Sequence, residues 1–284
     1  MKWEDRGRSP NLDDRRARGG AGRGLGGGAI PLGIGGIVLL FALSAITGID
    51  LLSLFGLGGA PTSAPPSQQE LQAEEEQVRF VSFVLDDVQG FWQETFVQSG
   101  IDYPASTLVL YRDAVESGCG VAPAATGPFY CPTDLNVYLD LSFYDQLRSR
   151  YGAPGDFAQA YVLAHELGHH VQNALGTLAM SQRSQQTQPG SANQLSVATE
   201  LQADCYAGVW AASAAARGIM EVGDLEEGLN AAAAVGDDTL AQRTGRIPNQ
   251  ETFTHGSAEQ RSRWFHTGYE TGDPNACDTF AQGF

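Results

Sequence analysis

Two histidines and a glutamate in the segment 165–169 could bind and use a metal ion. The segment reads His-Glu-Leu-Gly-His. Histidines at positions i and i+4 of a helix lie one above the other on one face, so both imidazoles can reach the same cation. Glu166 would lie beside that cation, where its carboxylate can accept a proton from a zinc-activated water. The pattern predicts the centre of a zinc-dependent hydrolase, with His165 and His169 as ligands and Glu166 as general base.

The helices that carry these side chains are predicted from the spacing of apolar residues. Apolar residues recur at helical spacing from Asp156, a suitable N-cap, to Gly176, a suitable residue after the last turn. Residues 156–175 are therefore expected to form one helix of about five turns. An alanine-rich apolar run predicts a second helix over residues 191–217. His170 would point roughly 100° away from the preceding ligand, so we leave it out of the metal site.

A tetrahedral zinc site that keeps one position open needs a third protein ligand. The best candidate is Glu200 on the second predicted helix, with Asp204 four residues later on the same face. Asp204 could accept the distal N–H of a zinc histidine, which we expect to be His165. Both acids could instead be solvated surface groups, but the alanine and aromatic residues around them favour burial. The sequence thus predicts one Zn²⁺ held by His165, His169 and Glu200.

Longer stretches around these residues resemble the neutral zinc metallopeptidases of bacteria. The resemblance is carried by residues 1–6 with Ser9, 129–132, 137–141, 165–172, 200–208 and 255–268. Glu-x-x-x-Asp after His-Glu-x-x-His is also similar to the gluzincin arrangement, in which the glutamate ligates zinc. The resemblance covers nearly the whole chain. It implies an α+β fold, a mostly helical zincin-like domain with a small sheet, and a peptide or protein substrate of unspecified kind.

A second electrophile usually helps the metal to stabilise the oxyanion that forms from a scissile carbonyl. His255 is the candidate for this transition-state donor, and Tyr138 and His266 are alternatives. Each has a simpler interpretation, because His255 could cap a helix that begins near Ser257 and the other two could be core residues. A capping box is expected there, since Gln260 lies three residues after Ser257.

Two functions are consistent with these residues. The first is a membrane-anchored zinc peptidase that hydrolyses peptide bonds, and the second is a non-catalytic, membrane-tethered binding module that retains a structural metal. Glu166 favours the peptidase, because a structural zinc needs no carboxylate beside an open coordination site.

The N-terminal part of the chain predicts a membrane anchor. Residues 29–50 include an apolar stretch long enough to cross about 30 Å of hydrocarbon at about 1.5 Å per helical residue. By the positive-inside rule the basic segment 1–28 would stay in the cytoplasm, and the domain would be exported on the outer face of the cytoplasmic (inner) membrane. A cleaved signal peptide is the alternative, which the length of the stretch disfavours. Residues 51–76 are expected to be a linker, and residues 77–284 the zinc metallopeptidase domain.

Cysteine usage and charge agree with export. All four cysteines lie beyond the apolar stretch, and an even number outside the cytoplasm predicts two disulfides. The expected pairs are Cys119 with Cys131 and Cys205 with Cys277, although four cysteines allow three pairings. Beyond residue 24 the chain has 10 basic and 29 acidic residues. Such a negative surface repels phosphate backbones and argues against a nucleic-acid partner.

Apolar patterning also predicts the remaining elements. A helical pattern is expected from about residue 68, with a long amphipathic helix whose apolar residues run from 78 to 92 and whose end lies near Gly100. Further helices are expected over 142–150, 224–235 and 257–271, and strands over 107–111 and 136–141. By analogy with zincins, a sheet edge would bind an extended substrate backbone. The strand at 137–141 is the candidate for this edge.

Overall fold

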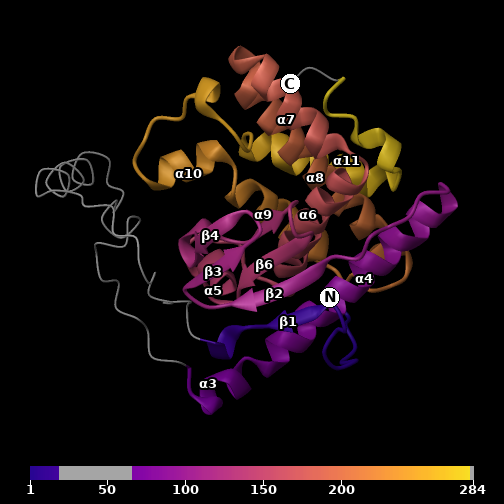
Figure 1. Cartoon of the computed structure of the whole chain (residues 1–284), viewed down its shortest axis with the longest axis vertical. Helices are drawn as coiled ribbons and strands as arrows, with labels where there is room; N and C mark the ends of the chain where they lie inside the picture. Colours follow the sequence, from indigo (N-terminus) through magenta and orange to yellow (C-terminus); the bar gives the residue numbers. More distant parts are fainter. Residues whose placement is uncertain (19–65, 282–284) are drawn as a thin grey trace, which may run out of the picture.

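The computed structural model describes residues 1–18 and 66–281. The predicted anchor at 29–50 and most of the predicted linker lie outside these residues. Across the described ranges, no helix is both long enough and apolar enough to span a bilayer. Helices predominate and a small sheet accompanies them, which confirms the expected α+β class (Figure 1). The helices are α3 (Gln68–Ala73), α4 (Glu75–Gln98), α5 (Ser142–Ser149), α6 (Asp156–Ala174), α7 (Thr177–Thr187), α8 (Ala192–Ala216), α9 (Asp224–Ala234), α10 (Asp237–Arg243) and α11 (Ala258–Thr271).

The main sheet has the strand order β1-β2-β6-β5. Its strands are β1 (Leu12–Asp14), β2 (Thr107–Tyr111), β6 (Asn136–Asp140) and β5 (Phe129–Cys131). β1, β2 and β6 run parallel, and β5 pairs antiparallel with β6. β6 is paired on both sides, so the expectation that strand 137–141 offers an edge to substrate is wrong. Local apolar patterning does not show which distant segments pair, so it could not predict the strand order. Beside β6, the edge of the sheet is formed by β5.

Alternate residues of β2 face opposite sides of the sheet, as strand geometry requires. Leu108 and Leu110 are fully buried in the large core formed with the helices, whereas Val109 and Tyr111 belong to a smaller cluster. Val115, in the hairpin of β3 (Ala114–Ser117) and β4 (Gly120–Pro123), belongs to the same small cluster. Helices and hairpin thus cover the two faces of the sheet.

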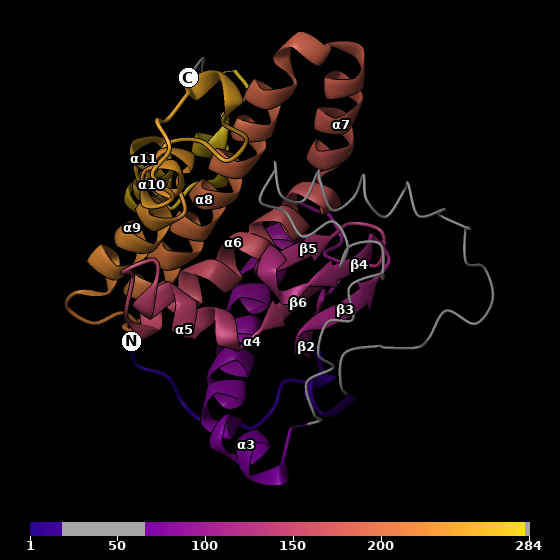
Figure 2. The ribbon, with the colours of Figure 1, turned by 90° about the vertical axis from the view of Figure 1, so that its left-hand side faces the viewer.

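Helices α6, α8 and α11 lie together in the domain (Figure 2), and three glycines let them approach closely. A Cβ on Gly168 of α6 would lie 2.9 Å from the carbonyl oxygen of Ala203 in α8. A Cβ on Gly208 of α8 would lie 2.0 Å from the carbonyl oxygen of Phe265 in α11, and Gly268 of α11 meets α8 in the same way. Because only hydrogen fits at these points, the backbones of α6, α8 and α11 are in contact. This packing brings the side chains of three distant segments to one place.

The helices that carry the metal motif differ from the expectation only at their ends. α6 covers the predicted 156–175 helix, but its N-cap is Gly155 and Asp156 is its first residue. Gly176 has a left-handed backbone (φ 80°) and separates α6 from α7. The capping box of Ser257 and Gln260 is present at the start of α11. Local sequence therefore defined these helices well.

Both expected disulfides are present. Cys119 is bonded to Cys131, the last residue of β5. Cys205 of α8 is bonded to Cys277 in the short helix η5 (Pro274–Cys277), which fastens the C-terminal segment to the helix that carries Glu200.

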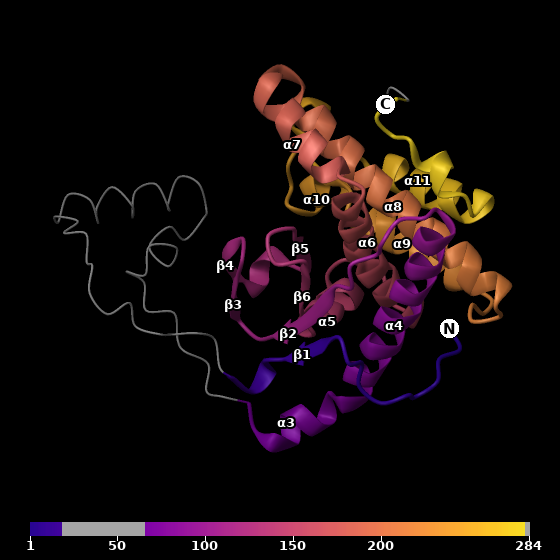
Figure 3. The same cartoon turned by 45° about the vertical axis from the view of Figure 1, so that its right-hand side comes forward.

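The N-terminal segment lies on the domain rather than apart from it (Figure 3). β1 pairs in parallel with β2, and the first helix after the undescribed stretch begins at Gln68, inside the predicted linker. This differs from the predicted division, in which a bilayer separates residues 1–28 from the domain. Two strands can form backbone hydrogen bonds only when they lie in the same compartment. The distribution of charge along the sequence does not show which strands pair, so it could not predict the contact between β1 and β2.

Candidate metal centre

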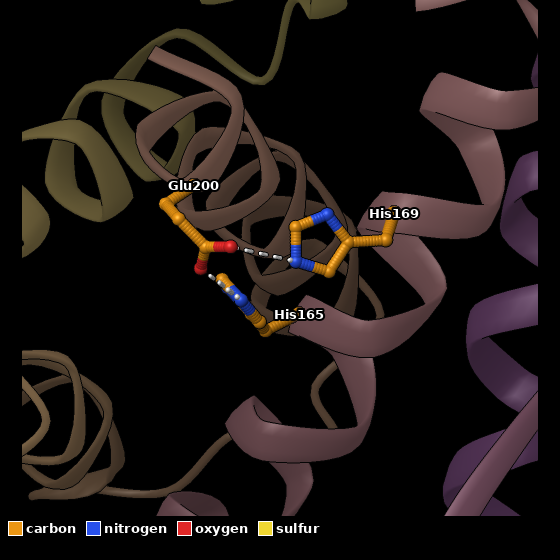
Figure 4. A group of neighbouring side chains, drawn as sticks. All are labelled: His165, His169 and Glu200. Carbon is orange, nitrogen blue, oxygen red and sulfur yellow. Dashed lines mark ion pairs between the residues drawn. The ribbon is translucent and has the colours of Figure 1, made fainter. Parts of the chain in front are cut away.

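Three predicted ligand side chains meet between α6 and α8. The Glu200 carboxylate lies between the rings of His165 and His169 (Figure 4). One carboxylate oxygen is 3.3 Å from Nε2 of His165, and the other is 3.5 Å from Nε2 of His169. Ligand atoms about 2.0–2.1 Å from a tetrahedral zinc stand about 3.3 Å from one another. The residues present therefore fit a zinc ion.

The other ring nitrogen of His165 faces Asp204. Nδ1 lies 2.8 Å from a carboxylate oxygen of Asp204, which is fully buried. In the neutral imidazole the Nδ1–H donates to this carboxylate, which leaves the lone pair of Nε2 directed at the Glu200 side. The structure thus gives Asp204 the contact expected of it.

His169 is held in the same sense by Gln172, a residue that the sequence analysis missed. Nδ1 of His169 lies 2.8 Å from the amide oxygen of Gln172, which can only accept. The Gln172 amide nitrogen donates to the carbonyl oxygen of Thr199 and to the side chain of Gln202 on α8. A glutamine three residues after a ligand histidine lies on the same helix face, so spacing alone could have indicated it. Both Nε2 atoms consequently point inward.

Arg261 and Tyr161 complete the surroundings of Asp204, and neither was expected there. Arg261 of α11 donates to both oxygens of Asp204, at 2.8 and 2.9 Å, and the Tyr161 hydroxyl donates to one of them at 2.5 Å. Burial alone would raise the pKa of Asp204, but Arg261 and His165 outweigh it and lower that pKa. The signal for Arg261 was its position on the buried face of α11, in line with Trp264, Phe265 and Gly268.

Glu166 borders a cleft of about 450 Å³ that also contains the three metal-binding candidates. Within the part of the chain that the structure describes, no hydrogen bond is made to its carboxylate, and the residue is only 8 % exposed. Burial raises the pKa of Glu166, and the charge of Glu200 acts in the same direction. Glu166 is therefore a poorly solvated carboxylate whose oxygens are available to accept a hydrogen bond or a proton. A larger groove along the start of α8 contains none of these side chains.

His255 lies at the same cleft, beside a carboxylate that was not predicted. Its Nδ1 is 3.2 Å from Asp237, whose other oxygen accepts the backbone N–H groups of Thr254 and His255. The hydrogen bond to Asp237 raises the pKa of His255. Of the alternative donors, the hydroxyl of Tyr138 is bonded to Asp134, and His266 lies near Glu270; neither borders the cleft.

His170 is directed away from the metal centre, as expected from its position. Its Nδ1 lies 3.0 Å from the Tyr130 hydroxyl, and its Nε2 lies 2.5 Å from the carbonyl oxygen of Pro104. Since the carbonyl can only accept, Nε2–H donates to it and Nδ1 accepts from Tyr130. His170 thus joins α6 to β5, the strand at the edge of the sheet.

We expect zinc binding to release a proton from His165. Burial disfavours the charged ring, but Asp204 and Glu200 outweigh it and raise the pKa of His165 to about 9. Below that pH the metal must displace a proton, so the apparent zinc affinity should rise about tenfold per pH unit between about pH 6 and pH 9. Chelator-competition titrations across this range measure the slope. Asp204→Asn removes the charge that raises the pKa and should give a shallower slope; an unchanged slope would refute this assignment of the proton.

Comparison with known proteins agrees with this geometry. The model of a family described as "Putative neutral zinc metallopeptidase" matches residues 1–280. The chain belongs to this family. The metallopeptidase family match begins at residue 1, so it includes the N-terminal segment as well as the metal centre.

Relatives of this family member occur in Escherichia coli and in Mycobacterium tuberculosis. The uncharacterized protein YpfJ of Escherichia coli strain K12 is 44% identical over 288 residues, which cover 99% of each chain. The uncharacterized protein Rv2575 of Mycobacterium tuberculosis strain H37Rv is 48% identical over 190 residues, 63% of this chain and 64% of its own. No solved structure matches the chain.

Proposed function

We propose that this protein is a zinc-dependent peptidase in which His165, His169 and Glu200 hold one zinc ion and Glu166 is the general base. The observation that carries the proposal is the pair of Nε2–carboxylate distances, 3.3 and 3.5 Å, together with outward hydrogen bonds from both Nδ1 atoms. Zinc held by these residues would supply a Lewis acid that can polarise a carbonyl and lower the pKa of water toward neutrality.

The protein's own groups account for the proton transfers. Glu166 accepts a proton from the attacking water and passes it to the departing amine, and its raised pKa makes the carboxylate a stronger base for the first of these transfers. Asp204 and Gln172 fix the orientation of the two imidazoles, so the rings need not reorganise during turnover.

His255 is proposed as the donor to the developing oxyanion. It lines the cleft, and the Asp237 contact favours its charged form. His255→Gln should lower kcat about 10²–10³-fold, the usual loss for one such donor, and leave zinc affinity unchanged. His266→Gln on the far side of α11 is the matched control and should retain parental kcat. Equal kinetics of the two variants would exclude His255 from the reaction.

Hydrolysis of an unstructured protein by the full chain, followed by mass spectrometry, tests the function directly. We expect cleavage with zinc, none after removal of zinc by a chelator, and recovery when zinc is restored. A chain that binds one zinc ion yet cleaves no member of a diverse peptide library would favour the membrane-tethered binding module instead.

Attachment to the outer face of the cytoplasmic membrane through residues 29–50 is proposed from the sequence. The two disulfides support the compartment, because such bonds persist where the surroundings are oxidising.

A further inference from the structure

The N-terminal segment 1–18 is bound to the domain at several points along its length. The indole of Trp3 packs edge-on against Phe80 of α4, with ring centroids 5.6 Å apart. The Ser9 hydroxyl donates to Asp86 of α4 at 2.6 Å. These contacts seat the segment against the N-terminal half of α4 (Figure 3).

Backbone pairing then joins the segment to the sheet. Leu12, Asp13 and Asp14 are in register with Leu108, Val109 and Leu110 of β2. The Arg15 N–H donates to the carbonyl oxygen of Leu110, and the Leu108 N–H donates to that of Asn11, both at 2.8 Å. Without β1 this side of β2 would present unpaired backbone groups, a site for association with other chains.

Ion pairs fasten the two described ends that flank residues 19–65. Arg16 is 1 % exposed and pairs with Asp14 at 2.8 Å and with Glu74 at 2.6 Å. Arg8 pairs with Glu75 at 2.5 Å. Glu74 and Glu75 lie at the junction of α3 and α4, one short helix after residues 19–65. If the segment left the domain, the partly buried carboxylate of Glu74 would lose its ion pair with the guanidinium of Arg16. The ion pairs with Glu74 and Glu75 therefore hold the segment in one specific position.

From these contacts we infer that residues 1–18 and the metallopeptidase domain lie on the same side of any membrane that the chain meets. Basic charge alone predicts a different division, with the tail inside and the domain outside. It follows also that the folded unit includes residues 1–18, in agreement with a family match that starts at residue 1. The inference does not depend on peptidase activity.

Thiol labelling of the full chain in the bacterium that expresses it tests the inference. All four native cysteines are in disulfides, so a single added cysteine reports its own position. Arg18→Cys reports the segment and Arg263→Cys reports the domain; both side chains are exposed. A membrane-impermeant maleimide is applied to spheroplasts before and after permeabilisation, with the parent chain as background. Labelling of both sites, or of neither until permeabilisation, supports the inference. Labelling of one site alone before permeabilisation overturns it.

A cross-link tests the docking itself in the same cells. Arg8→Cys with Glu75→Cys places two thiols at a described ion pair, and a short membrane-permeant bismaleimide should join most of them within one chain. Arg8→Cys with Arg263→Cys is the matched control, for which we expect only background. Equal yields from the two pairs would show that the segment is not docked in the cell.

Discussion

Glu166→Gln is expected to lower kcat by about 10³–10⁴-fold while zinc remains bound with parental affinity. The amide has nearly the same shape as the carboxylate but cannot accept a proton from water at neutral pH. Within the described residues nothing donates to the buried Glu166 carboxylate, so the substitution breaks no hydrogen bond. Steady-state kinetics on a cleaved peptide, with zinc content measured on the same samples, give both quantities.

The control for this loss is Glu259→Gln, which changes an exposed carboxylate on α11 and should retain parental kcat. Turnover by Glu166→Gln within tenfold of the parent would remove Glu166 from the role of general base. Loss of zinc from this variant would instead place Glu166 among the ligands, and the proposed arrangement of three ligands would then fail.

The part of the site that could be predicted is the part that helical spacing encodes. His165 and His169 are one turn apart, as are Glu200 and Asp204, and apolar periodicity alone predicts both helices. That the two helices meet was inferred from the need of a zinc site for a third protein ligand, and the close approach of α6 and α8 at Gly168 provides the contact.

Contacts between segments that are distant in the sequence could not be predicted from helical spacing. Arg261 reaches Asp204 across 57 residues of sequence, and its charge on an otherwise apolar helix face was the only local sign. β1 is three residues long and reads Leu-Asp-Asp, with no alternation to indicate a strand. Its partner β2 lies about a hundred residues later, so basic composition dominated the interpretation of this segment and led to a separate tail.

Asp204→Leu is expected to have two separable effects, one on folding and one on the metal. It leaves the Arg261 guanidinium buried at 3 % exposure without its bidentate partner, which should lower the free energy of unfolding by about 3–5 kcal/mol. It also removes the acceptor that orients His165, which should weaken zinc binding about 10–100-fold. Urea unfolding of the metal-free protein and chelator competition measure the two effects independently.

The double variant Asp204→Leu/Arg261→Met distinguishes them. Replacing both members of a buried ion pair by apolar side chains of similar size is often neutral for stability, so most of the lost unfolding free energy should return. Zinc affinity should stay about 10–100-fold below that of the parent, because the Nδ1 of His165 still lacks its acceptor. Recovery of zinc affinity together with stability would mean that Asp204 serves only to neutralise Arg261. Recovery of stability alone would establish that its contact with His165 is what prepares the site for the metal.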